Sequence, residues 1–135
     1  MSYSIAEIEG IGPAYAKKLQ AAGIRTTDAY LERARDPKGR KALAEETGID
    51  DKRILKWANM ADLMRIKGVG EEYSELLEAA GVDTVKELRN RNAENLAQKM
   101  REVNGAKKLV RQVPADSAVA DWVKQAKSLP PMMTY

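Results

Sequence analysis

Hydrophobic residues recur along most of the chain at intervals of three and four, the spacing of one face of an α-helix. No stretch alternates apolar and polar residues for long enough to indicate a strand. The pattern therefore predicts an all-α fold, one compact domain of about nine or ten short helices. The longest expected helix runs from Asp51 to about Arg65, with Ile54, Ala61 and Met64 on its inward side.

One segment occurs twice, because residues 8–24 reappear as residues 66–82. Each copy has two glycines separated by one apolar residue, followed by a helical pattern that ends at another glycine. We therefore predict two hairpin turns, the first glycine turn at residues 9–12 and the second at residues 67–70. The identical pairs are Ile8 and Ile66, Gly10 and Gly68, Gly12 and Gly70, Tyr15 and Tyr73, Leu19 and Leu77, Ala21 and Ala79, Ala22 and Ala80, Gly23 and Gly81, and Thr26 and Thr84.

Other local signals mark where the helices begin and end. The expected N-caps are Thr26 or Thr27, Asp36, Asp50, Thr84 (opening a capping box with Glu87) and Ser117. Gly48 is expected to end one helix, and Gly105 is matched to it in the second copy. The residues after Pro131 are expected to be loose.

The two copies are not separated by a flexible linker. The helix at residues 50–66 runs directly into the second glycine turn, so it closes the first half (1–65) and opens the second (50–135). Trp57 and Trp122 occupy matching places in the two halves. Their internal helical positions favour core packing over stacking on nucleic-acid bases.

The amino-acid composition excludes several kinds of catalytic and metal-binding site. The chain has 44% hydrophobic and 32% charged residues, a net charge of +3, and neither cysteine nor histidine. Disulfides, thiolate metal sites, cysteine nucleophiles and histidine bases are therefore excluded, and we expect no enzyme, cofactor or metal. Asp50 and Asp51 could be read as a metal pair, but an N-cap followed by a first-turn acid is the simpler interpretation. We expect a cytoplasmic protein with no membrane span.

The first glycine turn is the main candidate site. Alternating glycines let main-chain N–H groups point outward together, and the helix from Pro13 adds its positive end, an arrangement that suits phosphate. Lys17, Lys18 and Arg25 outweigh Glu9, giving a charge of +2 between residues 8 and 25. The candidate backbone contacts are Gly10, Ile11, Gly12, Ala14, Lys17, Lys18 and Arg25. The alternative is that the glycines only permit a tight turn; the two interpretations are evenly balanced.

The second glycine turn is acidic, with a charge of −3 between residues 66 and 82. Glu75 and Leu76 stand where Lys17 and Lys18 stand in the first copy, so a structural role is favoured. The candidates for secondary phosphate contacts are Lys67, Gly68, Val69, Gly70, Arg35, Lys38, Arg40 and Lys41, with similar cations at Arg89, Arg91, Lys107, Lys108 and Arg111. A solvated surface is the alternative for these cations.

The glycine turns resemble the helix-hairpin-helix class of nucleic-acid-backbone binders. The whole chain resembles a bacterial family of domains of unknown function built on tandem helix-hairpin-helix, SAM-like units. The residues that carry the wider resemblance are 8–13, 55–70, 113–114 and 121–122. The resemblance implies the tandem fold over about the full length, and it implies no reaction.

Two functions follow as hypotheses. The first is non-enzymatic, sequence-independent binding of duplex DNA through the first glycine turn and its lysines. The alternative is a protein-interaction or scaffold domain that uses an acidic face formed by Glu72, Glu75 and an exposed Leu76.

Overall fold

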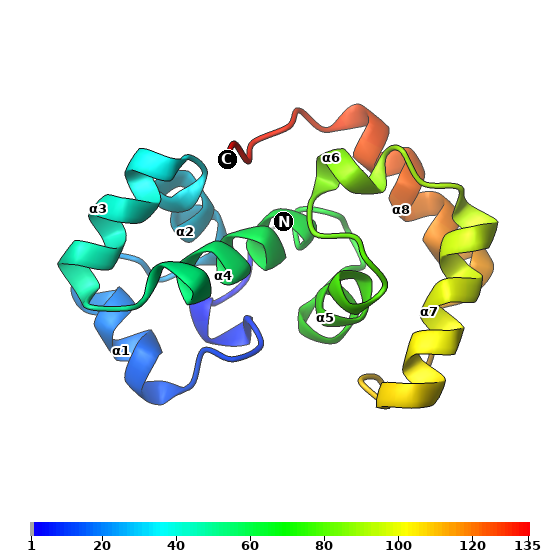
Figure 1. The fold of residues 1–135 in the computed structure, drawn as a ribbon, viewed down its shortest axis with the longest axis horizontal. Coiled ribbons are helices and arrows are strands. Elements are labelled where there is room, and N and C mark those ends of the chain that lie inside the picture. Colours follow the sequence, from blue (N-terminus) through cyan, green and yellow to red (C-terminus); the bar gives the residue numbers. More distant parts are fainter. Residues whose placement is uncertain (1) are drawn as a thin grey trace.

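The computed structural model describes residues 2–135, which form helices joined by short connections (Figure 1). This range holds eight α-helices and one 3₁₀-helix, and its only strand-like pairing is an isolated bridge between Ser4 and Thr26. The elements are η1 (Ile5–Glu7), α1 (Pro13–Ala21), α2 (Thr27–Ala34), α3 (Pro37–Thr47), α4 (Asp51–Leu63), α5 (Glu71–Ala79), α6 (Val85–Leu88), α7 (Ala93–Lys107) and α8 (Asp116–Ser128). The all-α class is confirmed, and the nine helical elements agree with the expected nine or ten.

Short-range caps start four of the helices as expected. Thr26, Asp36, Asp50 and Thr84 each accept a hydrogen bond from the backbone N–H three residues further on. The capping box at Thr84 is only half formed. The carboxylate of Glu87 accepts from the N–H of Asp83 at 3.0 Å, one residue before the position that the box requires.

The predicted helix stop at Gly105 is wrong, because this glycine lies inside α7. The helix ends at Lys107, and its C-cap Lys108 takes the left-handed conformation (φ +52°) and donates its N–H to the Asn104 carbonyl at 2.8 Å. The Asn104 side chain accepts from the Val110 N–H at 2.9 Å and donates to the Val110 carbonyl at 3.2 Å. This clamp holds the chain in a turn that a lysine would not favour alone.

Two further boundaries differ from expectation. The central helix α4 ends at Leu63 because the chain then tightens into i+3 bonding, with Arg65 N–H on the Asp62 carbonyl at 3.2 Å and Ile66 N–H on the Leu63 carbonyl at 3.1 Å. Ser117 is not an N-cap. It lies in the first turn of α8, where no side chain caps the helix.

Each half has its own hydrophobic core, and α4 contributes to both. Trp57 and Met60 are buried in the first core, whereas Leu63 is buried in the second. Asp62 fixes the junction: it is 1% exposed and accepts hydrogen bonds from the Val85 N–H at 2.8 Å and from an Arg65 Nη at 2.7 Å. Figure 1 shows α4 running between the halves, with α5 on its second-half side.

The C-terminal segment is ordered, so the expectation that it is loose is wrong. From α8 it crosses back to the first half beside α2 and α3 (Figure 1). Met133 is only 7% exposed in the first core. The Thr134 N–H donates to the Arg35 carbonyl at 2.8 Å, and Arg40 donates to the Thr134 carbonyl at 2.7 Å. The polar and proline-rich sequence of the segment does not predict these contacts, because their partners lie far away in the chain.

Candidate nucleic-acid interface

The first glycine turn is built on a tryptophan. Gly10 has φ +93°, and a Cβ placed on it would lie 3.2 Å from the Trp57 Nε1 of α4. A side chain here would therefore combine backbone strain with a steric conflict. Ile11 points into the core (5% exposed), and its N–H donates to the Ile8 carbonyl at 3.1 Å. Ile11 shapes the turn, so its prediction as a phosphate donor is wrong.

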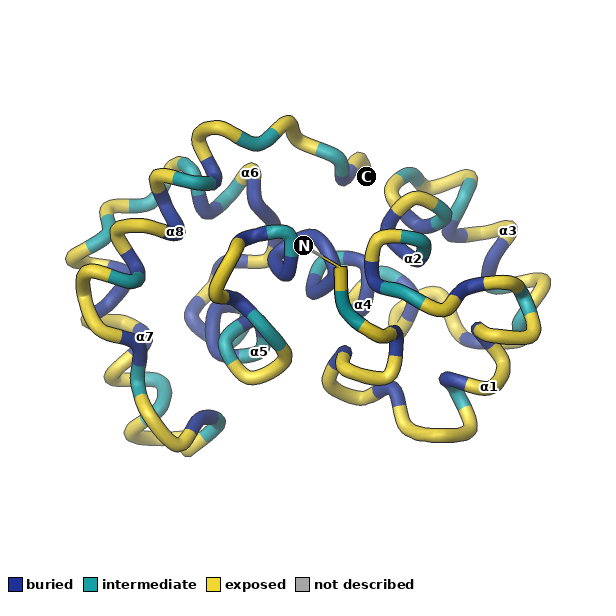
Figure 2. The backbone as a smooth tube through the Cα atoms, turned by 180° about the vertical axis from the view of Figure 1, so that it is seen from behind, coloured by how far each residue is buried: buried dark blue, intermediate teal, exposed yellow. Residues whose placement is uncertain are grey.

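The neighbouring main-chain donors are open. Within residues 2–135, the N–H groups of Gly10, Gly12, Ala14 and Tyr15 have no acceptor. The first three of these residues are exposed, and Gly12 is the cap residue of α1. Figure 2 shows the turn and much of α1 exposed at one edge of the molecule. An oxyanion here would meet several N–H groups and the positive end of a nine-residue helix.

The predicted cations lie on the same helix or just beyond it. Lys17 and Lys18 are exposed on α1, and Arg25 is exposed after the helix stop. None of the three forms a salt bridge within the part of the chain that the structure describes. The Lys18 Nζ lies 5.9 Å from the ring centre of Tyr15, so an aromatic face supports this side chain.

Arg53 is a further cation at this edge that sequence patterns missed. Its guanidinium lies 5.6 Å from the Tyr15 ring centre, while the Tyr15 ring packs edge-on against Trp57 at 5.1 Å. Arg53 also pairs with Asp50, and the hydrogen bond holds the pKa of the Asp50 carboxyl below its ordinary value. Its position four residues before the buried Trp57 was the available signal, because that spacing places it on the Trp57 side of α4.

The second glycine turn repeats this scaffold. Gly68 has φ +100°, and a Cβ on it would lie 3.1 Å from the Trp122 Nε1 of α8. Tyr73 packs against Trp122 at 5.2 Å, and the Val69 N–H donates within the turn to Ile66 at 3.0 Å. The Val69 N–H is therefore unavailable to a ligand. The correspondence of Trp57 and Trp122 is confirmed, as is their burial.

In the second turn, a glutamine side chain also engages the backbone of Lys67. The Gln125 side chain of α8 accepts from the Lys67 N–H at 2.9 Å and donates to the Lys67 carbonyl at 3.0 Å. The N–H groups of Gly68 and Gly70 have no acceptor within residues 2–135. The second turn thus keeps two of its four predicted main-chain donors.

The two turns adjoin, and carboxylates collect between them. Tyr3, before η1, lies with its hydroxyl 3.4 Å from the Val69 carbonyl. A hydrogen bond with the Glu9 carboxyl raises the pKa of Glu71 to about 7, helped by partial burial and by the negative charges of Glu9, Glu72 and Glu7. Acidic side chains therefore adjoin Gly10 of the first turn as well as Gly70 of the second, and the exposed Lys17 and Lys18 follow on α1.

Comparison with known proteins assigns the family. The model of the family described as "Domain of unknown function (DUF4332)" matches residues 9–129. The chain belongs to the DUF4332 family. Neither a curated protein nor a solved structure gives a significant match to it.

In this DUF4332 member, the predicted acidic interaction face has no exposed apolar residue at Leu76. Leu76 is fully buried, contrary to the prediction, because α5 packs against both α4 and α7. Glu75 is half-buried, and burial raises the pKa of its carboxyl, with Glu9 adding to the effect. Glu72 is exposed, so only the acidic part of the predicted surface remains.

The cationic segment of α2 and α3 lies apart from the first glycine turn. Arg40 is 9% exposed and donates to the Ala34 and Thr134 carbonyls, so its prediction as a phosphate contact is wrong. Arg35 lies 3.9 Å from Glu32, while Lys38 and Lys41 are exposed. In Figure 1, α3 begins beside the C-terminal segment, on the opposite side of the half from the turn before α1. Lys41, further along α3, lines a surface pocket with Asp50, the ion-pair partner of Arg53.

Asp50 acts as the N-cap of α4, with Asp51 in its first turn. Residues 2–135 contain no group of three or more acidic side chains arranged to hold a metal ion. Over the same range, no helix has the length and apolar character needed to cross a membrane.

Proposed function

We propose that this domain contains two helix-hairpin-helix motifs and that the first binds the phosphate backbone of duplex DNA without reading its sequence. The observation that carries the proposal is the exposed group of unpartnered N–H donors at Gly10, Gly12 and Ala14, followed on α1 by the unpaired Lys17 and Lys18. Main-chain donors at a helix N-terminus and nearby ammonium groups are the two elements of a phosphate contact. Contacts of this kind carry no base information.

In this proposal the second motif is a structural support and does not hold DNA. Its helix α5 begins with Glu71 and Glu72, which would face the same phosphates that Gly70 could bind. Carboxylates at that position repel a polyanion and cancel the benefit of the helix dipole for an anionic ligand. The DNA therefore lies along α1, beside Arg53 of α4, which pairs with Asp50 and lies over the Tyr15 ring.

The test is fluorescence anisotropy of a labelled 20-base-pair duplex at about 25 and 150 mM salt. We expect micromolar affinity at low salt and a steep loss at high salt, typical of a few phosphate contacts. The double variant Lys17→Glu/Lys18→Glu should bind at least tenfold more weakly. The matched control is Lys124→Glu/Lys127→Glu, which makes the same charge change at two exposed positions of α8, in the other half. Equal losses in both variants, or no binding at low salt, would overturn the proposal.

A second pair of variants tests the main-chain donors themselves. Gly12 has φ −81° and open space where a Cβ would lie, so alanine fits there and the φ is close to the one that proline adopts. Gly12→Pro removes one N–H and fills the donor position with its ring, whereas Gly12→Ala keeps the N–H. We expect binding several-fold weaker for the proline variant alone. Equal affinities would show that the lysines bind DNA without the turn.

A further inference from the structure

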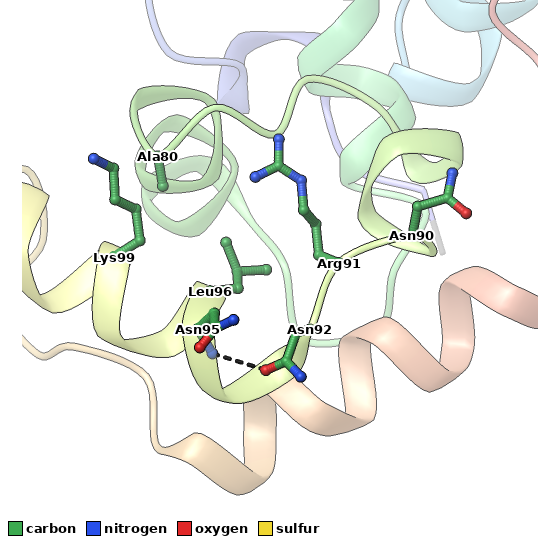
Figure 3. A pocket seen from close by; sticks show the side chains of 7 residues that line it. All are labelled: Ala80, Asn90, Arg91, Asn92, Asn95, Leu96 and Lys99. Atoms are coloured by element: carbon green, nitrogen blue, oxygen red, sulfur yellow. Dashed lines mark hydrogen bonds between the residues drawn. The ribbon is translucent and has the colours of Figure 1, made fainter.

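The second half holds a pocket that the proposed DNA site does not use. It has a volume of about 340 Å³ and lies between the end of α5, the α6–α7 connection and the first turns of α7 (Figure 3). Its lining residues are Ala80, Asn90, Arg91, Asn92, Asn95, Leu96 and Lys99. This volume is at the small end of the range for organic ligands.

The pocket combines an apolar floor with two cationic walls. Ala80 and Leu96 are 5% and 3% exposed. Figure 3 shows Arg91 and Lys99 on either side of them, both extending toward the end of α5. None of the lining residues is acidic. The floor can accept a small apolar body, and an anionic group above it would lie between two positive side chains.

The Arg91 guanidinium is held in place with donors to spare. Its Nη2 donates to the Gly81 carbonyl at 2.8 Å and lies 3.4 Å from a Glu87 oxygen. Its Nη1 and Nε have no acceptor within residues 2–135. Anchoring one nitrogen fixes the guanidinium, so less side-chain freedom is lost when its other edge binds an oxyanion.

Lys99 is a cation without a counterion. It is exposed on α7 and forms no salt bridge within the described part of the chain. At the start of the same helix, the Asn92 side chain accepts the Asn95 N–H at 3.0 Å, which keeps the asparagine-lined rim ordered (Figure 3). Lys99 has no counterion, and Arg91 shares its Nη2 with Glu87 but keeps Nη1 and Nε open, so donors of positive charge beside an apolar floor favour a ligand that carries negative charge.

The geometry points to a binding site for a small organic anion, whose carboxylate or phosphate group bridges Arg91 and Lys99 while its apolar part covers Ala80 and Leu96. This site is independent of the proposed DNA contact on α1. Carboxylate and phosphate share the oxyanion chemistry that both side chains recognise, and the probes below separate them.

The test is a ¹H–¹⁵N NMR titration of the full chain with inorganic phosphate, phenyl phosphate and benzoate, each to 20 mM. We expect saturable shifts at Gly81, Arg91, Leu96 and Lys99, with phenyl phosphate or benzoate binding more tightly than inorganic phosphate because of the apolar floor. Comparison of the two aromatic probes shows which oxyanion is preferred. Lys99→Gln, at an exposed position, should weaken binding at least fivefold.

The matched control is Lys127→Gln, which removes the same charge from an exposed position on α8. It should leave the affinity unchanged, and Lys99→Gln should leave DNA binding unchanged. Equal weakening by both substitutions, or no saturable shift with any probe, would overturn the site. Chemical-shift changes at Gly10 and Gly12 would indicate that the anion binds at the first glycine turn. The titration therefore tests the pocket and the DNA site separately.

Discussion

The two glycine turns share a scaffold and differ in what surrounds it. In both, a glycine with positive φ lies against a tryptophan Nε1, and a tyrosine packs on that tryptophan. The first turn is followed by Lys17 and Lys18, the second by Glu71 and Glu72. The comparison shows that a backbone able to donate to phosphate is one requirement, and that the sign of the nearby charge is a separate one.

The position of each turn in the fold separates them further. The helix α1 lies at an edge, whereas α5 packs against α4 on one side and α7 on the other. A helix with two neighbours buries two faces, so Leu76 is covered where Lys18 is exposed. The first copy keeps a free surface for a ligand, and the second contributes more to the core.

The largest expected effect tests the shared scaffold. Trp57→Ala and Trp122→Ala should each lower the free energy of unfolding by about 3–5 kcal/mol, because both remove a buried aromatic ring and leave a cavity. Urea unfolding followed by circular dichroism measures both. A cost below about 1 kcal/mol in one variant alone would mean that the two tryptophans do not play equivalent roles.

The turn glycines should give the next largest effect. Gly10→Ala and Gly68→Ala combine positive φ with a Cβ that meets a tryptophan Nε1, so each should cost about 1–3 kcal/mol. The controls Gly12→Ala and Gly70→Ala place a Cβ in open space at negative φ, and should change stability by less than about 0.5 kcal/mol. Similar costs at all four positions would contradict the packing that both turns share.

Reversing the acidic charge should make the second turn resemble the first. Glu71→Lys/Glu72→Lys removes two exposed carboxylates beside the open N–H groups and supplies two cations, so DNA affinity at low salt should rise about tenfold. The control Glu94→Lys/Glu102→Lys makes the same charge change at exposed positions of α7. An equal gain in the control would show that net charge, and not the turn, determines binding.

The smallest expected effect concerns the proton between the turns. The folded state raises the pKa of Glu71 to about 7 from its ordinary 4.5, so it binds this proton more tightly than the unfolded state does. This group therefore favours folding below about pH 4.5, and its contribution is lost as the pH rises toward 7.

Glu71→Gln should accordingly remove that loss and raise the melting temperature at pH 8 by about 2 °C, a small effect because solvent screens exposed charges. At pH 4 the two proteins should melt together. Glu94→Gln on α7 is the control and should leave the pH dependence unchanged. An unchanged profile in Glu71→Gln would mean that the carboxyls of Glu9 and Glu71 do not share a proton.

By itself, the sequence determined the features that depend on contacts within a few residues. Thr26, Asp36 and Asp50 cap their helices from three residues away, and the repeated glycines mark both turns. Such interactions can be recognised in the chain because both partners are neighbours in it.

Only the tertiary structure decided which surfaces are free. Leu76 is buried because a second helix covers α5, and Arg40 is buried by a segment more than ninety residues away in the chain. Glu9 reaches Glu71 because the two halves fold together. Helical periodicity identifies a face that packs against one neighbour, but it does not state how many neighbours a helix has. Charge and burial at the candidate sites were therefore set by long-range packing, which no local pattern encodes.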